Sequence, residues 1–149
     1  MPRERRPFVT LGAALVVSGL ALALWRMAAA PSGPVEPAWD RVPCARCHML
    51  VSNRAFAAQL HTDTGEVRFF DDPGCLLLFR AEANGTSTRA WFHDSAGEGW
   101  LAEAEARFVP AAETPMGHGY AAVSARRSPG APDAAATLAA LRAREGSSP

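Results

Sequence analysis

The first thirty residues constrain what the rest of the chain can become, because they have the layout of an export signal. Arg3, Arg5 and Arg6 form a positively charged start, and residues 8–25 then run without a charge. The small residues 28–30 are typical of a cleavage site, and the paired arginines also resemble a twin-arginine signal. An apolar run of about 18 residues is at the border between a signal peptide and a spanning helix. We therefore expect a periplasmic or otherwise extracytoplasmic domain, which is anchored to the inner membrane if this segment is retained.

Size, charge and cysteine content limit the number of domains, the kinds of partner and the number of disulfides. After its ends are discounted, a chain of 149 residues has room for one domain. Fifteen basic and fifteen acidic residues give no net charge, so electrostatics do not favour a nucleic-acid partner. Three cysteines exclude a framework of several disulfides. They leave two arrangements open, which are one disulfide with a free thiol and thiols held by a metal ion.

Patterns along the chain predict where the elements lie. Alternation over residues 56–60 and again over 66–71, with turn residues between them, predicts a β-hairpin. Asp72 can cap a helix in which Pro73 takes the first position. Residues 89–93 predict a further strand.

A similar order follows in the second half of the chain. Residues 107–109 and 120–125 are short strand candidates, and Asp133 can cap a helix that reaches about Arg144. Because strand, strand and helix occur in this order twice, the sequence predicts the α+β class.

The predicted domain boundaries follow from these patterns. Residues 31–43 carry four prolines and predict an extended linker. Residues 44–145 are the expected folded domain, with two halves of about 44–99 and 100–145. Residues 146–149 are expected to form a disordered tail.

Two short clusters, residues 44–49 and 114–119, hold most of the soft metal-binding side chains. Beyond the N-terminal segment the chain has two methionines, Met49 and Met116, and one lies in each cluster. Thiolate, thioether and imidazole ligands together favour Cu(I). The candidate metal ligands are Cys44, Cys47, Met49, Met116 and His118.

Several interpretations of the Cys44–x–x–Cys47 pair remain open. A structural zinc site usually needs four ligands, and the sequence has one such pair. A redox pair usually lies at a helix start, whereas this one follows a proline-rich segment. A structural disulfide is a third interpretation. Met49 favours a soft metal, because in an extended segment Cys47 and Met49 point to the same side and His48 points away.

Cys75 has two interpretations of its own. As the third residue of the predicted helix it meets unpaired backbone N–H groups, which lower a thiol pKa and suit a third thiolate ligand. It also suits a small buried residue that faces the sheet, and this packing role is the one we favour from the sequence. Asp71 and Asp72 are explained as helix caps, so we expect no acid positioned beside the thiols.

Several motifs taken together resemble the NosL family, the nitrous oxide reductase accessory proteins. The resemblance covers roughly residues 41–144. It rests on Cys44-x-x-Cys47-x-Met49-Leu50-Val51, Ala57-Ala58-Gln59, Val67-x-Phe69-Phe70-Asp71-Asp72-x-Gly74-Cys75 and Thr114-Pro115-Met116-Gly117-x-Gly119-x-Ala121-Ala122.

The resemblance implies a function and a fold. It implies an exported Cu(I)-binding chaperone, not an enzyme, that delivers copper for the maturation of nitrous oxide reductase in denitrification or of another extracytoplasmic copper enzyme. The implied partners are that client and its assembly proteins, and the implied fold is two small ββα-type modules distantly like organomercurial lyase. The alternative function is a membrane-anchored thiol-disulfide oxidoreductase that uses Cys44 and Cys47.

Two features depart from the family pattern. Members are commonly lipoproteins with a cysteine just after the signal, and this chain has none there. Members often have glycine between the second cysteine and the methionine, where this chain has His48.

Overall fold

The computed structural model describes residues 16–22, 24–25, 31–83, 88–97 and 99–146. The arginine-rich start and the expected cleavage site at 28–30 lie outside the described residues, as does most of the expected tail. Residues 16–22 and 24–25 are helical and exposed. Among the described residues, no helix combines the length and apolar character needed to span a membrane.

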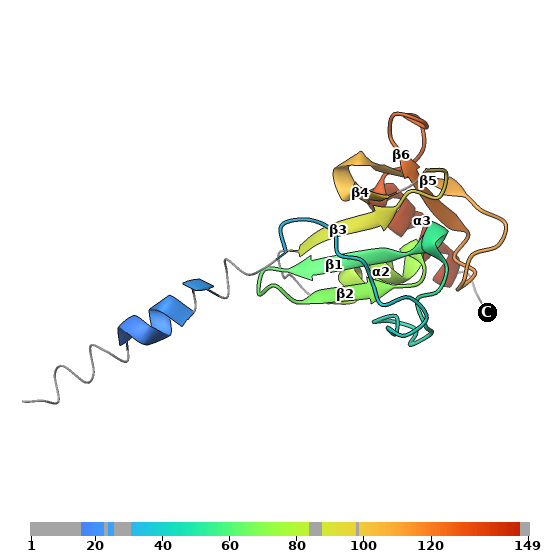
Figure 1. Cartoon of the computed structure of the whole chain (residues 1–149). Helices are drawn as coiled ribbons and strands as arrows, with labels where there is room; N and C mark the ends of the chain where they lie inside the picture. The colour runs from blue at the N-terminus through green and yellow to red at the C-terminus, as the bar shows by residue number, and fades with distance from the viewer. Residues whose placement is uncertain (1–15, 23, 26–30, 84–87, 98, 147–149) are drawn as a thin grey trace, which may run out of the picture.

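A four-stranded antiparallel sheet with the strand order β2-β1-β3-β4 forms the larger part of the domain (Figure 1). Its strands are β1 (Ala58–Thr62), β2 (Val67–Phe70), β3 (Thr88–His93) and β4 (Trp100–Ala102). The predicted hairpin is confirmed, because β1 pairs with β2 through a turn in which Gly65 has a φ of 85°. A positive φ of this kind is the region that glycine adopts most readily.

The start of β1 corrects the predicted strand at 56–60. Residues Arg54–Phe56 form a 3₁₀ turn, η1, and the strand begins at Ala58. The cause is local, since the Asn53 side chain accepts a hydrogen bond from the Ala55 N–H group at 3.1 Å and turns the backbone before the strand starts.

A second, two-stranded sheet is formed by β5 (Ala106–Pro110) and β6 (Tyr120–Ser124), which pair antiparallel. Both strands were predicted within about two residues. β4 was not predicted, and it pairs with β3, so the first sheet extends into the second half of the chain. The two sheets and the helices make the fold mixed α+β.

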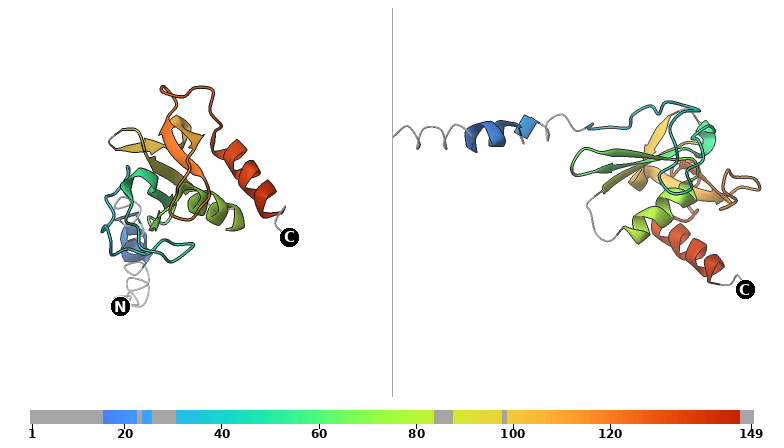
Figure 2. Two further views of the ribbon diagram at one scale, coloured as in Figure 1. Left: turned by 90° about the vertical axis from the view of Figure 1, so that its right-hand side faces the viewer. Right: turned by 90° about the horizontal axis from the view of Figure 1, so that it is seen from below.

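Two helices lie next to each other and cover one side of the sheets (Figure 2). α2 (Pro73–Glu82) starts where expected, because Asp72 accepts a hydrogen bond from the Gly74 N–H group at 2.8 Å and Pro73 occupies the first turn. α3 (Ala134–Glu145) starts at the predicted Asp133 cap, which accepts from the Ala136 N–H group at 2.9 Å.

Aromatic residues connect the layers in the core. Phe70, Phe92 and Phe108 are fully buried. Phe92 of the first sheet meets Phe108 of the second edge-on, with 4.9 Å between ring centroids, and Phe70 meets Phe79 of α2 at 5.3 Å. The sheets and α2 therefore share one core, and the start of α2 is fixed against it.

The proline-rich segment before the domain lies along the sheet. The Gln59 side chain forms two hydrogen bonds with the backbone of Val35, accepting from its N–H group at 2.8 Å and donating to its carbonyl at 3.1 Å. Arg89 donates to the carbonyls of Pro31 and Ser32. These contacts tie residues 31–35, which the sequence predicts to be an extended linker, to β1 and β3.

Candidate metal centre

Residues 43–50 fold back on themselves and present the first two cysteines. Pro43 and Leu50 form an isolated antiparallel bridge, and the Cys44 N–H group donates to the Met49 carbonyl at 2.7 Å. The Ala45 N–H group donates to Phe69 of β2 at 2.8 Å, which fixes this loop to the sheet edge. The expectation of an extended segment is therefore wrong here, because residues 45–47 form a turn.

His48 completes this turn in a conformation that glycine favours. Its φ is 64°, and its side chain is exposed. A residue with a β-carbon pays a steric cost in the left-handed region, although histidine tolerates it better than most residues.

Replacing His48 by glycine is expected to raise the free energy of unfolding by up to about 1 kcal/mol, because glycine removes the left-handed strain. Urea unfolding of the full chain measures the change. The matched control is Arg126→Gly, at an exposed turn residue without positive φ, which is expected to lower stability. Equal losses in both variants would contradict this account of the turn.

The first turn of α2 brings the third cysteine to the same place. Cys44 and Cys75 are fully buried and Cys47 is half-buried. All three are free thiols, and their sulfur atoms lie within 4.8 Å of one another. A metal ion bound by all three sulfurs needs this kind of spacing, so the cluster could hold a metal ion.

The three thiols differ in acidity because they share hydrogen bonds. The pKa of Cys44 is lowered to about 4, first because the Cys75 thiol donates a hydrogen bond to it. Backbone groups of three neighbours add to the lowering, against the effect of burial: Cys47, Asp71 and Arg46. The same contact raises the pKa of Cys75, and burial raises it further. Burial is also the main reason that the pKa of Cys47 is raised. Cys44 is therefore the thiol of the cluster that loses its proton most readily, and Cys47 and Cys75 hold theirs more strongly than an ordinary thiol.

His118 reaches this cluster from the loop between β5 and β6. Its Nε2 atom lies 3.7 Å from the Cys75 sulfur. The imidazole ring occupies the space above Gly74, where an added β-carbon would come within 2.5 Å of the His118 Cγ atom. Gly74 therefore creates the space that allows the ring to lie against the start of α2.

Asp72 fastens the same loop to the helix. One carboxylate oxygen accepts the Gly74 N–H group, and the other accepts the Met116 N–H group at 3.2 Å. Gly117 and Gly119, with φ of 69° and 79°, provide the turns that the loop needs. The two soft clusters of the sequence thus converge on the first turn of α2.

The predicted ligands do not all hold equivalent positions. Cys44, Cys47 and His118 gather around Cys75. Met49 and Met116 are 59% and 38% exposed, and their backbones bond to Cys44 and Asp72 respectively. The methionines therefore belong to residues that border the cluster, with side chains partly in solvent.

Two features of this region differ from what the sequence led us to expect. Cys75 is buried, as its predicted packing role requires, but its sulfur is also part of the cluster. Its place in the first turn of the predicted helix was the sequence feature that indicated a possible ligand role. The expectation of no acid beside the thiols also needs correction. Asp71 is buried close enough to Cys44 to interact electrostatically, burial raises its pKa, and its carboxylate accepts the Ser52 N–H group at 3.1 Å.

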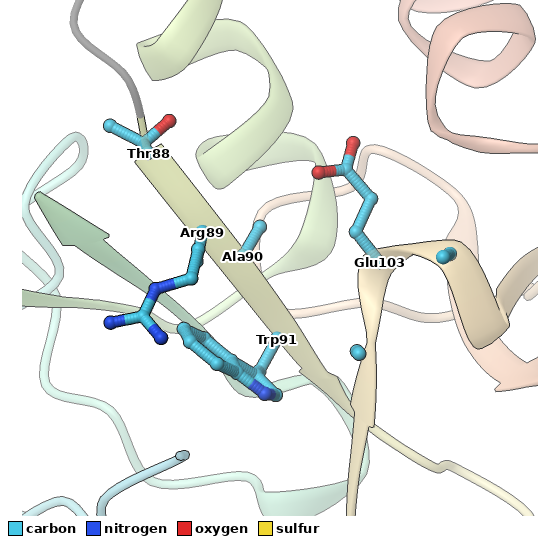
Figure 3. A pocket seen from close by; sticks show the side chains of 7 residues that line it. Thr88, Arg89, Ala90, Trp91 and Glu103 are labelled. Atoms are coloured by element: carbon cyan, nitrogen blue, oxygen red, sulfur yellow. The ribbon is translucent and has the colours of Figure 1, made fainter. Parts of the chain in front are cut away.

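A shallow pocket of about 420 Å³ lies elsewhere, on β3 and the segment after β4 (Figure 3). Its lining includes Thr88, Trp91 and Glu103, and none of the three cysteines contributes to it.

No protein-family model, curated protein or solved structure matches this chain. Among the described residues, the three cysteines form the group whose side chains could hold a metal ion.

Metal binding by all three sulfurs is expected to release about two protons per ion near pH 7, because Cys47 and Cys75 hold their protons and Cys44 does not. Affinity should therefore rise with pH until both thiols ionise. Titration in weakly buffered solution with a pH-indicator dye measures the release. Cys47→Ser is expected to reduce the release by about one proton, and binding without proton release would rule out thiol ligands.

Proposed function

We propose that the protein is an exported Cu(I) carrier that donates copper to an extracytoplasmic copper enzyme, with nitrous oxide reductase as the first candidate client. The observation that carries this proposal is the gathering of three cysteine sulfurs within 4.8 Å of one another. Two methionines with exposed side chains are tied to the same region through their backbones, Met49 to Cys44 and Met116 to Asp72. Thiolate and thioether ligands select Cu(I) over harder ions. In this proposal the metal ion is a cargo.

Ligand exchange is the proposed mechanism of transfer. Cys44 and Cys75 are buried and bind the ion on the side of the protein interior. Cys47 is half-buried, so its thiolate is the ligand that an incoming ligand of the partner reaches first. Met49 and Met116 border the cluster and accept the ion briefly as it leaves. Weak thioether ligands on the solvent side allow release without unfolding of the turn.

A thiol-disulfide enzyme is the alternative, and two observations weigh against it. A redox enzyme attacks its substrate with an accessible thiolate of low pKa. Here the thiol with the lowered pKa, Cys44, is fully buried, and the more accessible Cys47 has a raised pKa. The arrangement suits metal holding better than attack on another protein's disulfide.

Cleavage of a carbon–metal bond would need a free acid beside a thiol pair. Asp71 interacts electrostatically with Cys44, and one of its carboxylate oxygens accepts a hydrogen bond from the Ser52 N–H group, which fixes the carboxyl group in place. Asp72 likewise accepts two backbone N–H groups. Both acids have structural partners, so the proposal remains that the protein is not an enzyme.

Location and architecture complete the proposal. The β1–β2–α2 and β5–β6–α3 segments are consistent with two ββα-type modules, and the charged start with its apolar run supports export, with an anchor to the inner membrane if the run is retained. The partners are the copper client and its assembly proteins, with no role for nucleic acid.

Copper transfer tests the proposed function. Copper-loaded full-length protein is mixed with apo nitrous oxide reductase in the presence of a Cu(I) chelator, and metal is expected to reach the enzyme faster than it reaches the chelator. Met116→Leu should slow transfer, because it removes one exchangeable ligand while keeping size and apolar character. Absence of transfer together with repeated turnover of a disulfide substrate would favour the redox alternative.

A further inference from the structure

We propose that Cys44, Cys47, Cys75 and His118 also form a four-coordinate site for a divalent ion of zinc type, with His118 as the ligand that completes it. This inference rests on the proposed function in that it uses the same thiol cluster. It extends that function by assigning the thiol cluster a second ion. It also gives His118 a specific role, because His118 would bind Zn²⁺ as a fourth ligand and would not be needed by Cu(I).

The distance between the Cys75 sulfur and the His118 nitrogen fits one edge of a tetrahedral zinc site. Zinc binds thiolate sulfur at about 2.3 Å and imidazole nitrogen at about 2.0–2.1 Å in tetrahedral sites, so the sulfur–nitrogen edge is about 3.6 Å and the sulfur–sulfur edge about 3.8 Å. The Cys75 sulfur and the His118 Nε2 atom are 3.7 Å apart. The three sulfurs lie within 4.8 Å of one another, so they need to approach by at most about 1 Å. His118 contacts Cys75 and is not a member of that group, so closing the site also requires its ring to move toward Cys44 and Cys47.

The support around His118 provides the second argument. Its ring lies against Gly74, the position immediately before Cys75, where no side chain larger than hydrogen fits. Its carbonyl accepts a hydrogen bond from Arg144 of α3 at 3.2 Å, and its loop is bound to Asp72. The imidazole is thereby held at the Cys75 thiol by contacts that do not depend on a metal ion.

Ligand preference provides the third argument. Thiolates bind both zinc and Cu(I), and imidazole is a common zinc ligand, so the two ions differ here mainly in the number of ligands they need. Three sulfur ligands satisfy Cu(I), so the ion does not need His118. Zinc prefers four protein ligands in a closed site, and His118 supplies the one that the cysteines lack. Loss of His118 should therefore affect the two ions unequally.

Zinc X-ray absorption on the full-length protein tests this site. The expected spectrum shows about three sulfur neighbours and one imidazole. His118→Ala should remove the imidazole scattering and weaken zinc binding by about tenfold or more, while Cu(I) affinity changes by less than about threefold. Competition with chelators, zinc and copper being measured separately, gives both affinities.

Gly74→Ala gives an independent variant, because the added methyl group collides with the His118 ring and removes no ligand atom. It is expected to weaken zinc binding in the same direction. The matched controls are Gly130→Ala, where an added β-carbon meets nothing within 4 Å, and His48→Asn, at an exposed histidine of the cysteine turn. Both controls should bind zinc as the unaltered protein does.

The outcomes separate this inference from the proposed function. A zinc spectrum without imidazole, or unchanged zinc affinity in His118→Ala, overturns the four-coordinate site even if Cu(I) binds and transfers. Zinc bound with imidazole while Cu(I) fails to bind supports the site and overturns the carrier proposal. If Gly74→Ala does not fold, the His118→Ala comparison decides.

Discussion

Replacing Cys75 by serine is expected to lower the affinity for Cu(I) by at least about 100-fold, because a hydroxyl group is a hard and weakly acidic ligand in place of a soft thiolate. The Cys75 sulfur is fully buried and lies within 4.8 Å of both other cysteine sulfurs. The change is almost isosteric, so the fold around the first turn of α2 should persist. Anaerobic titration of the full chain against a competing Cu(I) chelator measures the loss.

Two comparisons make the Cys75 result decisive. Thermal unfolding of the metal-free Cys75→Ser variant shows whether the domain remains folded. Met49→Leu, at a residue that is 59% exposed, should lower affinity much less than Cys75→Ser. If Cys75→Ser keeps its copper affinity and loses only stability, Cys75 has a packing role alone.

Replacing Asp72 by alanine is expected to lower the free energy of unfolding by about 3 kcal/mol, which combines the loss of a helix cap and of a hydrogen bond to a charged group. The carboxylate is fully buried and accepts the Gly74 and Met116 N–H groups. Both donors then lose their partner inside the protein. Urea unfolding of the metal-free chain measures the effect.

Asp133→Ala is the matched control for Asp72→Ala. Asp133 caps α3 in the same way, but it is exposed and accepts one backbone N–H group, from Ala136. Its loss should cost about 1 kcal/mol. Equal costs at the two caps would contradict the argument that Asp72 joins α2 to the loop that carries Met116.

Elements fixed by neighbouring residues were predictable from the sequence. The start of α2 follows from Asp72 and Pro73, and the start of α3 follows from Asp133, because a cap and the helix it begins are adjacent in the chain. The hairpin β1–β2 follows from alternation around a turn. The start of β1 was displaced because the Asn53 side chain favours a 3₁₀ turn locally, and alternation alone does not reveal this.

Features fixed by contacts between distant residues were not predictable. β4 has three residues and exists because it pairs with Trp91–His93 of β3. The cluster depends on a turn at Cys44 and a helix start at Cys75, which the sheet brings together across thirty-one positions of sequence (75 − 44). The position of His118 depends on the space above Gly74, a relation that neither local sequence contains.

The ligand set was therefore predicted in part. The soft residues at 44–49 and 114–119 indicated the correct region, because their side-chain chemistry is unusual for a packed core. Chemistry did not distinguish residues inside the cluster from those at its border. Burial makes that distinction, since Cys44 and Cys75 are fully buried and both methionines are exposed to solvent.

Copper X-ray absorption on the full-length protein, loaded anaerobically with one equivalent of Cu(I), tests the central claim most directly. The claim is that the thiol cluster holds the ion, so the nearest neighbours of copper should be sulfur atoms, about three in number. The same measurement on Cys75→Ser should show fewer sulfur neighbours. A first coordination shell made only of nitrogen and oxygen atoms would contradict the claim.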